Sequence, residues 1–281
     1  MMLSNKRRIF VAVYKEDIIT NMKKVSLLFS MFFLLLISLH FNLNAQTQII
    51  VHRGYWNTIG SAQNSITALI KADSLHIYGS ETDVWLSTDG VPMVNHDDSI
   101  LCNGRKISVQ DSDSKTLKSI ILKNGENLPT LEAYLNAFEK CKHTKLIIEL
   151  KKHRTKNQED ELTSKVLKMI RKRRLQNRVE YISFGLNFTT KLIQLDPSAS
   201  VYYLNGDLSP RVMKEIGAAG IDYHYSVIYK HPEWVEMAHK LGLKVNVWTV
   251  DKPEDIQKML DLKVDFITTN DPLLVKKMQQ Q

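Results

Sequence analysis

The sequence predicts an α/β protein folded as one (β/α)₈ barrel, and three features carry this expectation. From Gln48 onward, short β-rich runs alternate with helical segments, a rhythm that indicates a parallel sheet covered by helices. About eight such units within about 230 residues fit a closed barrel better than an open doubly wound sheet. No glycine-rich dinucleotide fingerprint opens the first unit, which further disfavours the open sheet.

The individual elements follow from hydrophobic spacing. Residues 162–170 place apolar side chains at helical spacing with charges between them, as in an amphipathic helix. Thr130, directly after Pro129, is the expected N-cap of a helix through Phe138. The candidate strands are residues 48–52, 79–85, 91–95, 145–150, 179–184, 200–204, 220–223, 244–249 and 265–268.

Residues 98–128 interrupt this rhythm. They are polar and contain the run Asp111-Ser112-Asp113-Ser114, so we expect a small insertion packed near the barrel mouth. The chain has no long repeat, low-complexity tract or linker. Residues 46–281 are therefore expected to form a single domain.

A signal peptide is predicted over residues 22–45. Met22 and two lysines form a basic start, an apolar run follows at 25–39, and Ala45 precedes a polar stretch. That run is shorter than the roughly 20 residues of a membrane-spanning helix, so an uncleaved anchor is the weaker alternative. Residues 1–21 are expected to be an upstream extension from a misassigned start. The mature protein should be secreted or periplasmic, without a stable membrane anchor.

The charge of the chain falls once this segment is set aside. The full sequence has 38 Lys and Arg against 30 Asp and Glu. Residues 1–45 hold six of the basic and two of the acidic residues, so the net charge drops from +8 to +4. This modest excess does not indicate nucleic-acid binding and suits an anionic small-molecule substrate. Cys102 and Cys141 can form a bridge or stay free, and they make no metal-ligand pattern.

Three carboxylates are candidates for a metal site. Residues i and i+2 of a strand share a face, so Glu81 and Asp83 lie together if that face points into the barrel. Buried carboxylates repel and lose hydration, and a divalent cation with oxygen ligands offsets both costs. Glu149 ends an apolar run, so we expect it to be metal-bound or paired with Lys151. The alternative for the first two is an edge strand that faces water.

Two histidines end predicted strands, and each lies beside a charged residue. His52 ends the first strand and His96 the third, so both are expected at the end of the barrel where active sites form. Two imidazoles can divide general base and general acid between them near neutral pH. Arg53 can bind phosphate oxygens with its forked guanidinium, and Lys151 can add a point charge. The alternative is a structural role for each histidine.

The ordered motifs of the chain resemble those of the glycerophosphodiester phosphodiesterase family. They run from about residue 50 to Pro272, and their joint order and spacing are specific although each is short. The resemblance implies a (β/α)₈ barrel, which agrees with the alternation of elements. The motifs are His52-Arg53-Gly54, Gln63-Asn64-Ser65, Glu81-Thr82-Asp83-Val84, Thr88-Asp89-Gly90, Val94-Asn95-His96-Asp97, Glu149-Leu150-Lys151 and Asn246-Val247-Trp248-Thr249.

This resemblance implies a role for each matching residue. His52 and His96 match the acid/base pair, and Trp248 matches an aromatic residue at the pocket rim. Gln63 departs from the family, because it replaces the acidic residue of a Pro-Glu-Asn-Thr motif and so affects substrate details and local pKa values. The remaining matches are the metal-binding carboxylates Glu81, Asp83 and Glu149, with Mg²⁺ or Ca²⁺ as the usual ion, and the phosphate-contacting cations Arg53 and Lys151.

The implied reaction is metal-dependent hydrolysis of a glycerophosphodiester to glycerol 3-phosphate and an alcohol. One histidine takes a proton from the nucleophile, implied to be the glycerol 2-hydroxyl, and the other protonates the leaving alcohol. The alternatives are a related phosphodiesterase for a phosphoinositide or lysophospholipid, a non-catalytic phosphate-binding barrel, and a two-carboxylate glycosidase. The histidine pair argues against the second, and the adjacent cations argue against the third.

Overall fold

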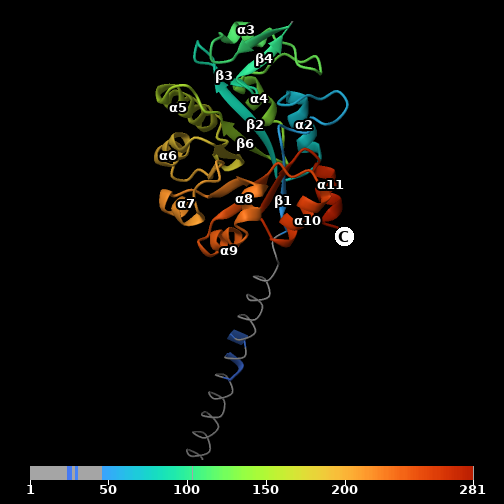
Figure 1. Ribbon diagram of the computed structural model, residues 1–281, viewed down its shortest axis with the longest axis vertical. Helices are drawn as coiled ribbons and strands as arrows, with labels where there is room; N and C mark the ends of the chain where they lie inside the picture. The colour runs from blue at the N-terminus through green and yellow to red at the C-terminus, as the bar shows by residue number, and fades with distance from the viewer. Residues whose placement is uncertain (1–23, 27–28, 31–45, 103, 281) are drawn as a thin grey trace, which may run out of the picture. The chain divides into compact units, whose positions relative to one another are not determined.

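Eight parallel strands close into a barrel at the centre of the described structure (Figure 1). In this computed structural model β1 pairs with β11 on one side and with β2 on the other, which completes the ring. The predicted (β/α)₈ barrel is confirmed. Its strands are β1 (Gln48–Val51), β2 (Gly79–Leu86), β6 (Lys145–Leu150), β7 (Val179–Ser183), β8 (Val201–Tyr203), β9 (Gly220–His224), β10 (Lys244–Trp248) and β11 (Phe266–Thr269).

The structure describes residues 24–26, 29–30, 46–102 and 104–280, and the residues from Thr47 onward form one compact unit. The upstream extension predicted at 1–21 lies outside the described residues. So does most of the signal peptide predicted at 22–45, of which 24–26 and 29–30 are helical. Among the described residues, no helix is both long enough and apolar enough to span a membrane.

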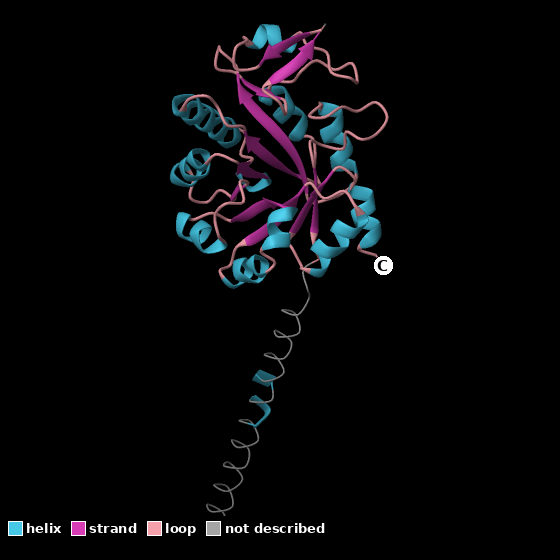
Figure 2. Cartoon of the chain, viewed as in Figure 1, coloured by secondary structure: helices cyan, strands magenta, loops and turns pink. Residues whose placement is uncertain are grey.

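Helices surround the barrel (Figure 2), and side-chain caps begin several of them. Ser65 accepts a hydrogen bond from the backbone N–H of Ala68, and the predicted N-cap Thr130 does the same for Ala133. The covering helices are α2 (Ile66–Ser74), α4 (Leu131–Phe138), α5 (Lys156–Lys172), α6 (Leu186–Leu195), α7 (Pro210–Ile216), α8 (Tyr225–Lys230), α9 (Glu233–Lys240), α10 (Pro253–Asp261) and α11 (Pro272–Met278), with a 3₁₀ turn at Gln176–Arg178.

The strands are buried on both faces, as parallel strands usually are. Outward residues pack against the helices, and inward apolar residues form a separate plug inside the barrel. The plug consists of Ile50, Ile147, Ile182, Tyr202, Leu204 and Phe266. Because side chains alternate along a strand, Glu149 faces the barrel interior two residues beyond Ile147.

One predicted strand is not part of the ring. The run at 91–95 forms β3 (Pro92–Val94), which pairs antiparallel with the end of β2, with Val84 opposite Val94. An apolar run does not reveal the direction of its partner, so the sequence did not distinguish this hairpin from a barrel strand. The chain therefore turns back along β2 before it enters the insertion.

The insertion predicted at 98–128 is a small lobe with its own core. It contains the hairpin of β4 (Ser99–Cys102) and β5 (Arg105–Ser108), followed by α3 (Ser114–Lys118). Its core side chains pack on the ends of β2 and β3, and Cys102 and Cys141 are both free. These core residues are Trp85, Met93, Val109, Leu117, Ile120 and Leu128.

Candidate active site

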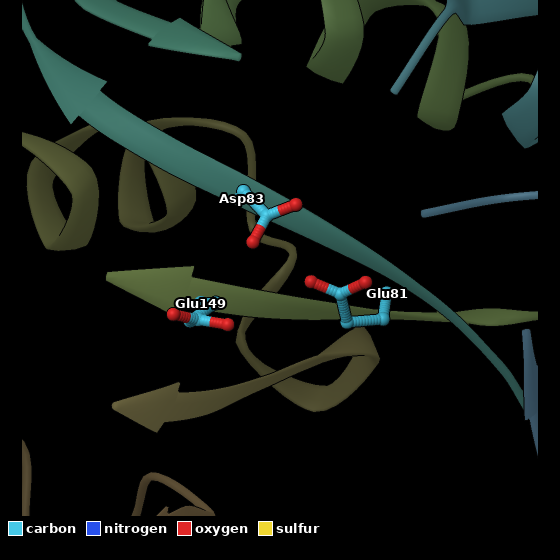
Figure 3. Close-up of side chains that lie close together, drawn as sticks. All are labelled: Glu81, Asp83 and Glu149. Carbon is cyan, nitrogen blue, oxygen red and sulfur yellow. The ribbon is translucent and has the colours of Figure 1, made fainter. Parts of the chain in front are cut away.

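Three carboxylates converge inside the barrel (Figure 3). Glu81 and Asp83 come from β2 and Glu149 from β6, where the parallel register sets Asp83 beside Glu149. One ligand oxygen from each lies within 4.8 Å of the others, and all three side chains are buried. The strand geometry expected for Glu81 and Asp83 is thus present, and the edge-strand alternative is wrong.

Two cations balance part of this charge. The Lys151 ammonium lies 3.2 Å from Asp83 Oδ1 and 2.7 Å from Glu149 Oε1. The backbone N–H of Arg53 donates to Glu81 Oε2 at 2.7 Å, and its guanidinium Nε lies 4.0 Å from Asp83 Oδ2. Glu81 Oε1 is buried and has no hydrogen-bond partner. One carboxylate oxygen in the cluster is therefore left available to a ligand.

The cations compensate the three acids unequally, so the pKa values of Glu81 and Glu149 are raised while that of Asp83 is lowered. Burial, together with the charges of Asp83 and Glu149, raises the pKa of Glu81 well above its usual range. Burial and the Asp83 charge raise the pKa of Glu149 to about 7, although Lys151 opposes the shift. Burial also acts against ionisation of Asp83, but Lys151 and His96 outweigh it and lower its pKa. A cation bound among these oxygens would favour the ionised form of all three.

Asn64 holds Asp83 in position. Its side-chain N–H donates to Asp83 Oδ2 at 2.8 Å, and its carbonyl oxygen accepts from the Thr82 hydroxyl at 2.8 Å. Asn64 has a φ of 59°, in the left-handed region that asparagine tolerates better than most residues. An asparagine therefore suits this position, directly before the Ser65 cap of α2, where the backbone is left-handed and the side-chain amide faces Asp83.

His52 is held by a chain of hydrogen bonds from the last strand. Its Nδ1 lies 2.9 Å from Asn270 Oδ1, and Asn270 in turn donates to Asp251 Oδ2 at 2.7 Å. This orientation of the amide places the imidazole proton on Nδ1 and leaves Nε2 as an acceptor, which receives Arg53 Nε–H at 3.2 Å. Burial, followed by the Arg53 charge, lowers the pKa of His52 to about 4. The ring is neutral at pH 7.

His96 reaches the same pocket by a different route. It does not end a barrel strand as predicted, because β3 runs antiparallel to β2 and returns the chain toward Asp83. The Asn95 N–H donates to the Asp83 carbonyl at 3.1 Å, which anchors this return. His96 Nδ1 lies 2.7 Å from Asp97 Oδ1, and burial lowers the pKa of His96 despite the Asp83 charge.

The residues predicted for the site surround one small cavity of about 120 Å³. Trp248 closes one side, with its indole N–H donating to the Asp222 carbonyl at 2.9 Å and its ring edge-on to Phe184. Lys151 and Asp83 are not among the lining residues, but Lys151 forms ion pairs with Asp83 and with the lining residue Glu149. The predicted residues that line the cavity directly are His52, Arg53, Glu81, His96, Glu149 and Trp248.

The structure adds residues that the sequence analysis did not select. Asp222, on β9, lines the same cavity, has a buried Oδ1 without a partner, and has its pKa raised to about 8 mainly by burial. An acidic residue within an apolar strand was the available signal. His153 donates from Nδ1 to the Lys151 carbonyl at 2.7 Å and accepts the Leu86 N–H at 2.9 Å. It links β2 to the segment that carries Lys151.

Gln63, which departs from the family motif, contacts Arg53, a residue predicted to bind the substrate phosphate. Arg53 Nη1 donates to Gln63 Oε1 at 2.8 Å. A neutral amide accepts this hydrogen bond without neutralising the guanidinium.

A barrel mouth that gathers carboxylates, two imidazoles and two cations around one cavity defines a hydrolase of the (β/α)₈ class that acts on an anionic ester.

Comparison with known proteins identifies the family. The profile of the glycerophosphoryl diester phosphodiesterase family matches residues 52–274. A crystal structure of a glycerophosphodiester phosphodiesterase from Parabacteroides distasonis ATCC 8503 is 44% identical, with a TM-score of 0.81 over 84% of this chain and 98% of that chain. The chain belongs to this family and is a phosphoric diester hydrolase, which confirms the resemblance seen in its motifs.

More distant relatives agree. A glycerophosphodiester phosphodiesterase of Caldanaerobacter subterraneus subsp. tengcongensis is 28% identical over 240 residues, which cover 81% of this chain and 95% of the relative. The structure of one from Thermotoga maritima has a TM-score of 0.66 at 22% identity, covering 84% of this chain and 99% of that one. At that identity the likeness supports the barrel fold alone.

Proposed function

We propose that this protein hydrolyses glycerophosphodiesters to glycerol 3-phosphate and an alcohol, in a reaction that depends on a divalent metal ion and two histidines. The observation that carries the proposal is the buried, unpartnered oxygen of Glu81 among three carboxylates, beside a cavity lined by His52, His96 and Arg53. A purely structural acidic cluster would be expected to have all its oxygens paired.

The donor set fits a hard cation. Glu81, Asp83 and Glu149 offer only oxygen ligands, which suits Mg²⁺ or Ca²⁺ rather than a softer metal. The three buried acids face two cations, Arg53 and Lys151. Their negative charge is therefore not fully balanced, and a bound cation would balance the remainder. When bound, such an ion supplies electrostatic stabilisation to the negative charge that develops on the phosphate.

The cations and Trp248 bind the substrate in this proposal. Among the described residues, the side-chain acceptors of the Arg53 guanidinium are the neutral groups of Gln63 and His52, and Asp83 Oδ2 lies 4.0 Å from its Nε. The guanidinium can therefore grip phosphate oxygens with its fork. Lys151 adds a positive charge. Burial lowers its pKa, but the charges of Asp83 and Glu149 outweigh burial and raise it, so the ammonium stays protonated. Trp248 forms the wall against which the rest of the substrate lies.

The histidines divide proton transfer between them. His52 is neutral, and its Nε2 accepts Arg53 Nε–H. When the guanidinium turns to the substrate phosphate, this lone pair can take the proton of the attacking hydroxyl. Burial lowers the pKa of His96, but the Asp97 carboxylate 2.7 Å from Nδ1 opposes that shift and supports a protonated imidazole that can protonate the leaving alcohol. Export with removal of residues 22–45 completes the proposal, supported by the basic and apolar pattern of that segment.

A panel of glycerophosphodiesters assayed with and without EDTA, followed by Mg²⁺ or Ca²⁺ add-back, tests the function. We expect chelation to abolish release of glycerol 3-phosphate and the metal to restore it. His52→Ala and His96→Ala should each lower kcat by about 10² to 10⁴. His143→Ala, in the exposed turn before β6, is the matched control and should be unaffected. Full activity in either site variant would refute the acid/base assignment.

A further inference from the structure

A second and larger cavity, of about 710 Å³, lies beside the catalytic one. One wall is the loop after β1, at residues 56–64, and the other is the insertion lobe, at residues 95–101 and 120–123. We call this cavity the outer groove. Its apolar lining residues are Trp56, Ile59, Ala62, Leu101, Ile120 and Ile121, among others.

The outer groove adjoins the catalytic cavity at His96. His96 lines both, so a molecule whose phosphate lies near Arg53 can pass this imidazole into the groove. Asn64, which holds Asp83, also lines the groove, and Gln63 connects the groove wall to the Arg53 guanidinium. A substrate whose phosphate lies in the catalytic cavity can therefore extend past His96 toward the outer groove, away from the carboxylates.

Exposed apolar side chains gather at the groove. In the described part of the compact unit, eight large hydrophobic side chains are exposed, and three of them line this groove. They are Ile59, Leu101 and Ile121, which are 96%, 71% and 59% exposed. Such residues are ordinary when scattered singly, but a cluster beside an active site indicates a binding surface. Ile120 and Ala62, both buried, extend the apolar surface inward.

Contacts within the chain hold both walls of the groove. The insertion packs on its own hydrophobic core, which includes Leu117, Ile120 and Leu128. On the opposite wall, the Ser61 hydroxyl donates to the Tyr55 carbonyl at 3.0 Å, and Ala62 N–H donates to Ser65 Oγ at 3.3 Å. A site formed in advance loses little conformational entropy when it binds an apolar ligand.

We propose that the outer groove binds an apolar chain carried by the phosphodiester substrate, so that the enzyme prefers lipid-derived diesters to those of small polar alcohols. This inference rests on the proposed function, because the phosphate must lie at the catalytic cavity. The chain can be an acyl group on the glycerol, as in a lysophospholipid, or the leaving alcohol itself.

Either form preserves the chemistry. An acyl group on a terminal glycerol hydroxyl leaves the 2-hydroxyl free to attack phosphorus. The bond from phosphorus to the leaving oxygen then breaks, and that oxygen takes one proton. Water opens the resulting cyclic phosphate, so one water is consumed for each alcohol released. No oxidant or further reactant is required.

The test compares three soluble substrates with the metal-loaded protein, each below its critical micelle concentration. They are glycerophosphocholine, its derivative with an octanoyl group on the terminal glycerol hydroxyl, and glycerophospho-octanol. We expect kcat/KM to rise by about fourfold for each methylene that the groove buries fully, mainly through a lower KM. The second and third substrates distinguish a chain on the glycerol from a chain on the leaving alcohol.

The double variant Leu101→Ser/Ile121→Ser tests the location. It should lower kcat/KM for the preferred octyl-bearing substrate by about tenfold or more, and leave glycerophosphocholine hydrolysis unchanged. Leu273→Ser, an exposed apolar site on α11, is the matched control and should change neither.

The outcomes separate the two proposals. If glycerophosphocholine is cleaved but neither chain raises kcat/KM, the groove inference is wrong and the function stands. If no substrate is cleaved under any metal condition, the proposed function fails first. A chain preference that survives in the double variant places the chain elsewhere. A wild-type dimer that the double variant dissociates in size-exclusion chromatography, without a chain preference, makes the groove a subunit interface and overturns the inference.

Discussion

Buried carboxylates occur at two levels of this barrel, and they are treated differently. Glu180, on β7 and below the plug, accepts a hydrogen bond from the Tyr78 hydroxyl and lies 2.7 Å from the Lys145 ammonium. At the mouth, Glu81 has one oxygen without a partner, and Glu149 shares Lys151 with Asp83. Both regions bury acid on inward-facing strand positions, but only the lower one satisfies it with the chain's own donors.

This difference separates stability from function. A paired carboxylate contributes to the fold and leaves nothing for a ligand. An under-compensated cluster costs stability in the metal-free protein, and the cost is recovered when a cation binds. Variants at the two levels test this comparison directly, because one should change mainly activity and the other mainly stability.

Glu81→Gln and Glu180→Gln should have opposite effects. Glu81→Gln removes a ligand oxygen and one repelling charge, so we expect about 10³-fold lower kcat but a metal-free protein that is more stable by about 1 kcal/mol. Glu180→Gln should retain kcat and lose about 1 kcal/mol of stability, because Lys145 keeps partial access to water. Steady-state kinetics and urea unfolding measure both. Equal loss of activity in the two variants would remove the distinction.

Asp222 extends the comparison to pH. Its pKa is raised to about 8 in the folded protein from an ordinary 3.8, so the folded state retains a proton that the unfolded state loses. Its contribution to stability is therefore full below about pH 4 and is lost as pH rises toward about 8. Asp222→Asn should remove this decline, and stabilise the metal-free protein near pH 8 by at least roughly 2 kcal/mol. Urea titrations of both proteins at each pH would check this, and parallel pH profiles would contradict it.

Metal affinity should depend on pH for the same reason. Glu149, with a pKa of about 7, and Glu81, also raised, must lose protons before they can bind a cation. We expect affinity at about pH 6 to be at least about tenfold below that at about pH 8, with proton release on binding. Isothermal titration of Mg²⁺ or Ca²⁺ in buffers of different ionisation enthalpy measures both quantities. Binding without proton release would show that these acids are already ionised.

Gln63→Glu is expected to have the smallest effect. It places a carboxylate against Arg53 Nη1, where it competes with substrate phosphate for the guanidinium. KM should rise by about threefold with kcat nearly unchanged. Gln63→Met, which is similar in size and uncharged, is the control. A larger KM in the control than in the acidic variant would show that the hydrogen bond matters more than the charge.

The sequence predicted more of the site than of its supports. The predicted acids, histidines and cations lie in short motifs within or directly after strands, where residue type and spacing limit what they can do. Asn270 and His153 act through hydrogen bonds to residues 218 and 67 positions away, respectively, which no local motif reveals. The third predicted strand was wrongly expected to be a strand of the barrel, because pairing direction is a property of two segments rather than one.

The sequence by itself determined the alternation that makes a barrel and the side chains that carry its chemistry, since both depend on local spacing and residue type. Only the tertiary structure decided that β6 lies beside β2, which brings Glu149 to Asp83 and leaves Glu81 Oε1 unpartnered. It alone decided that β3 returns His96 to the pocket and that the insertion forms the outer groove beside it. These arrangements depend on contacts between distant segments, whose geometry exists only when the barrel closes.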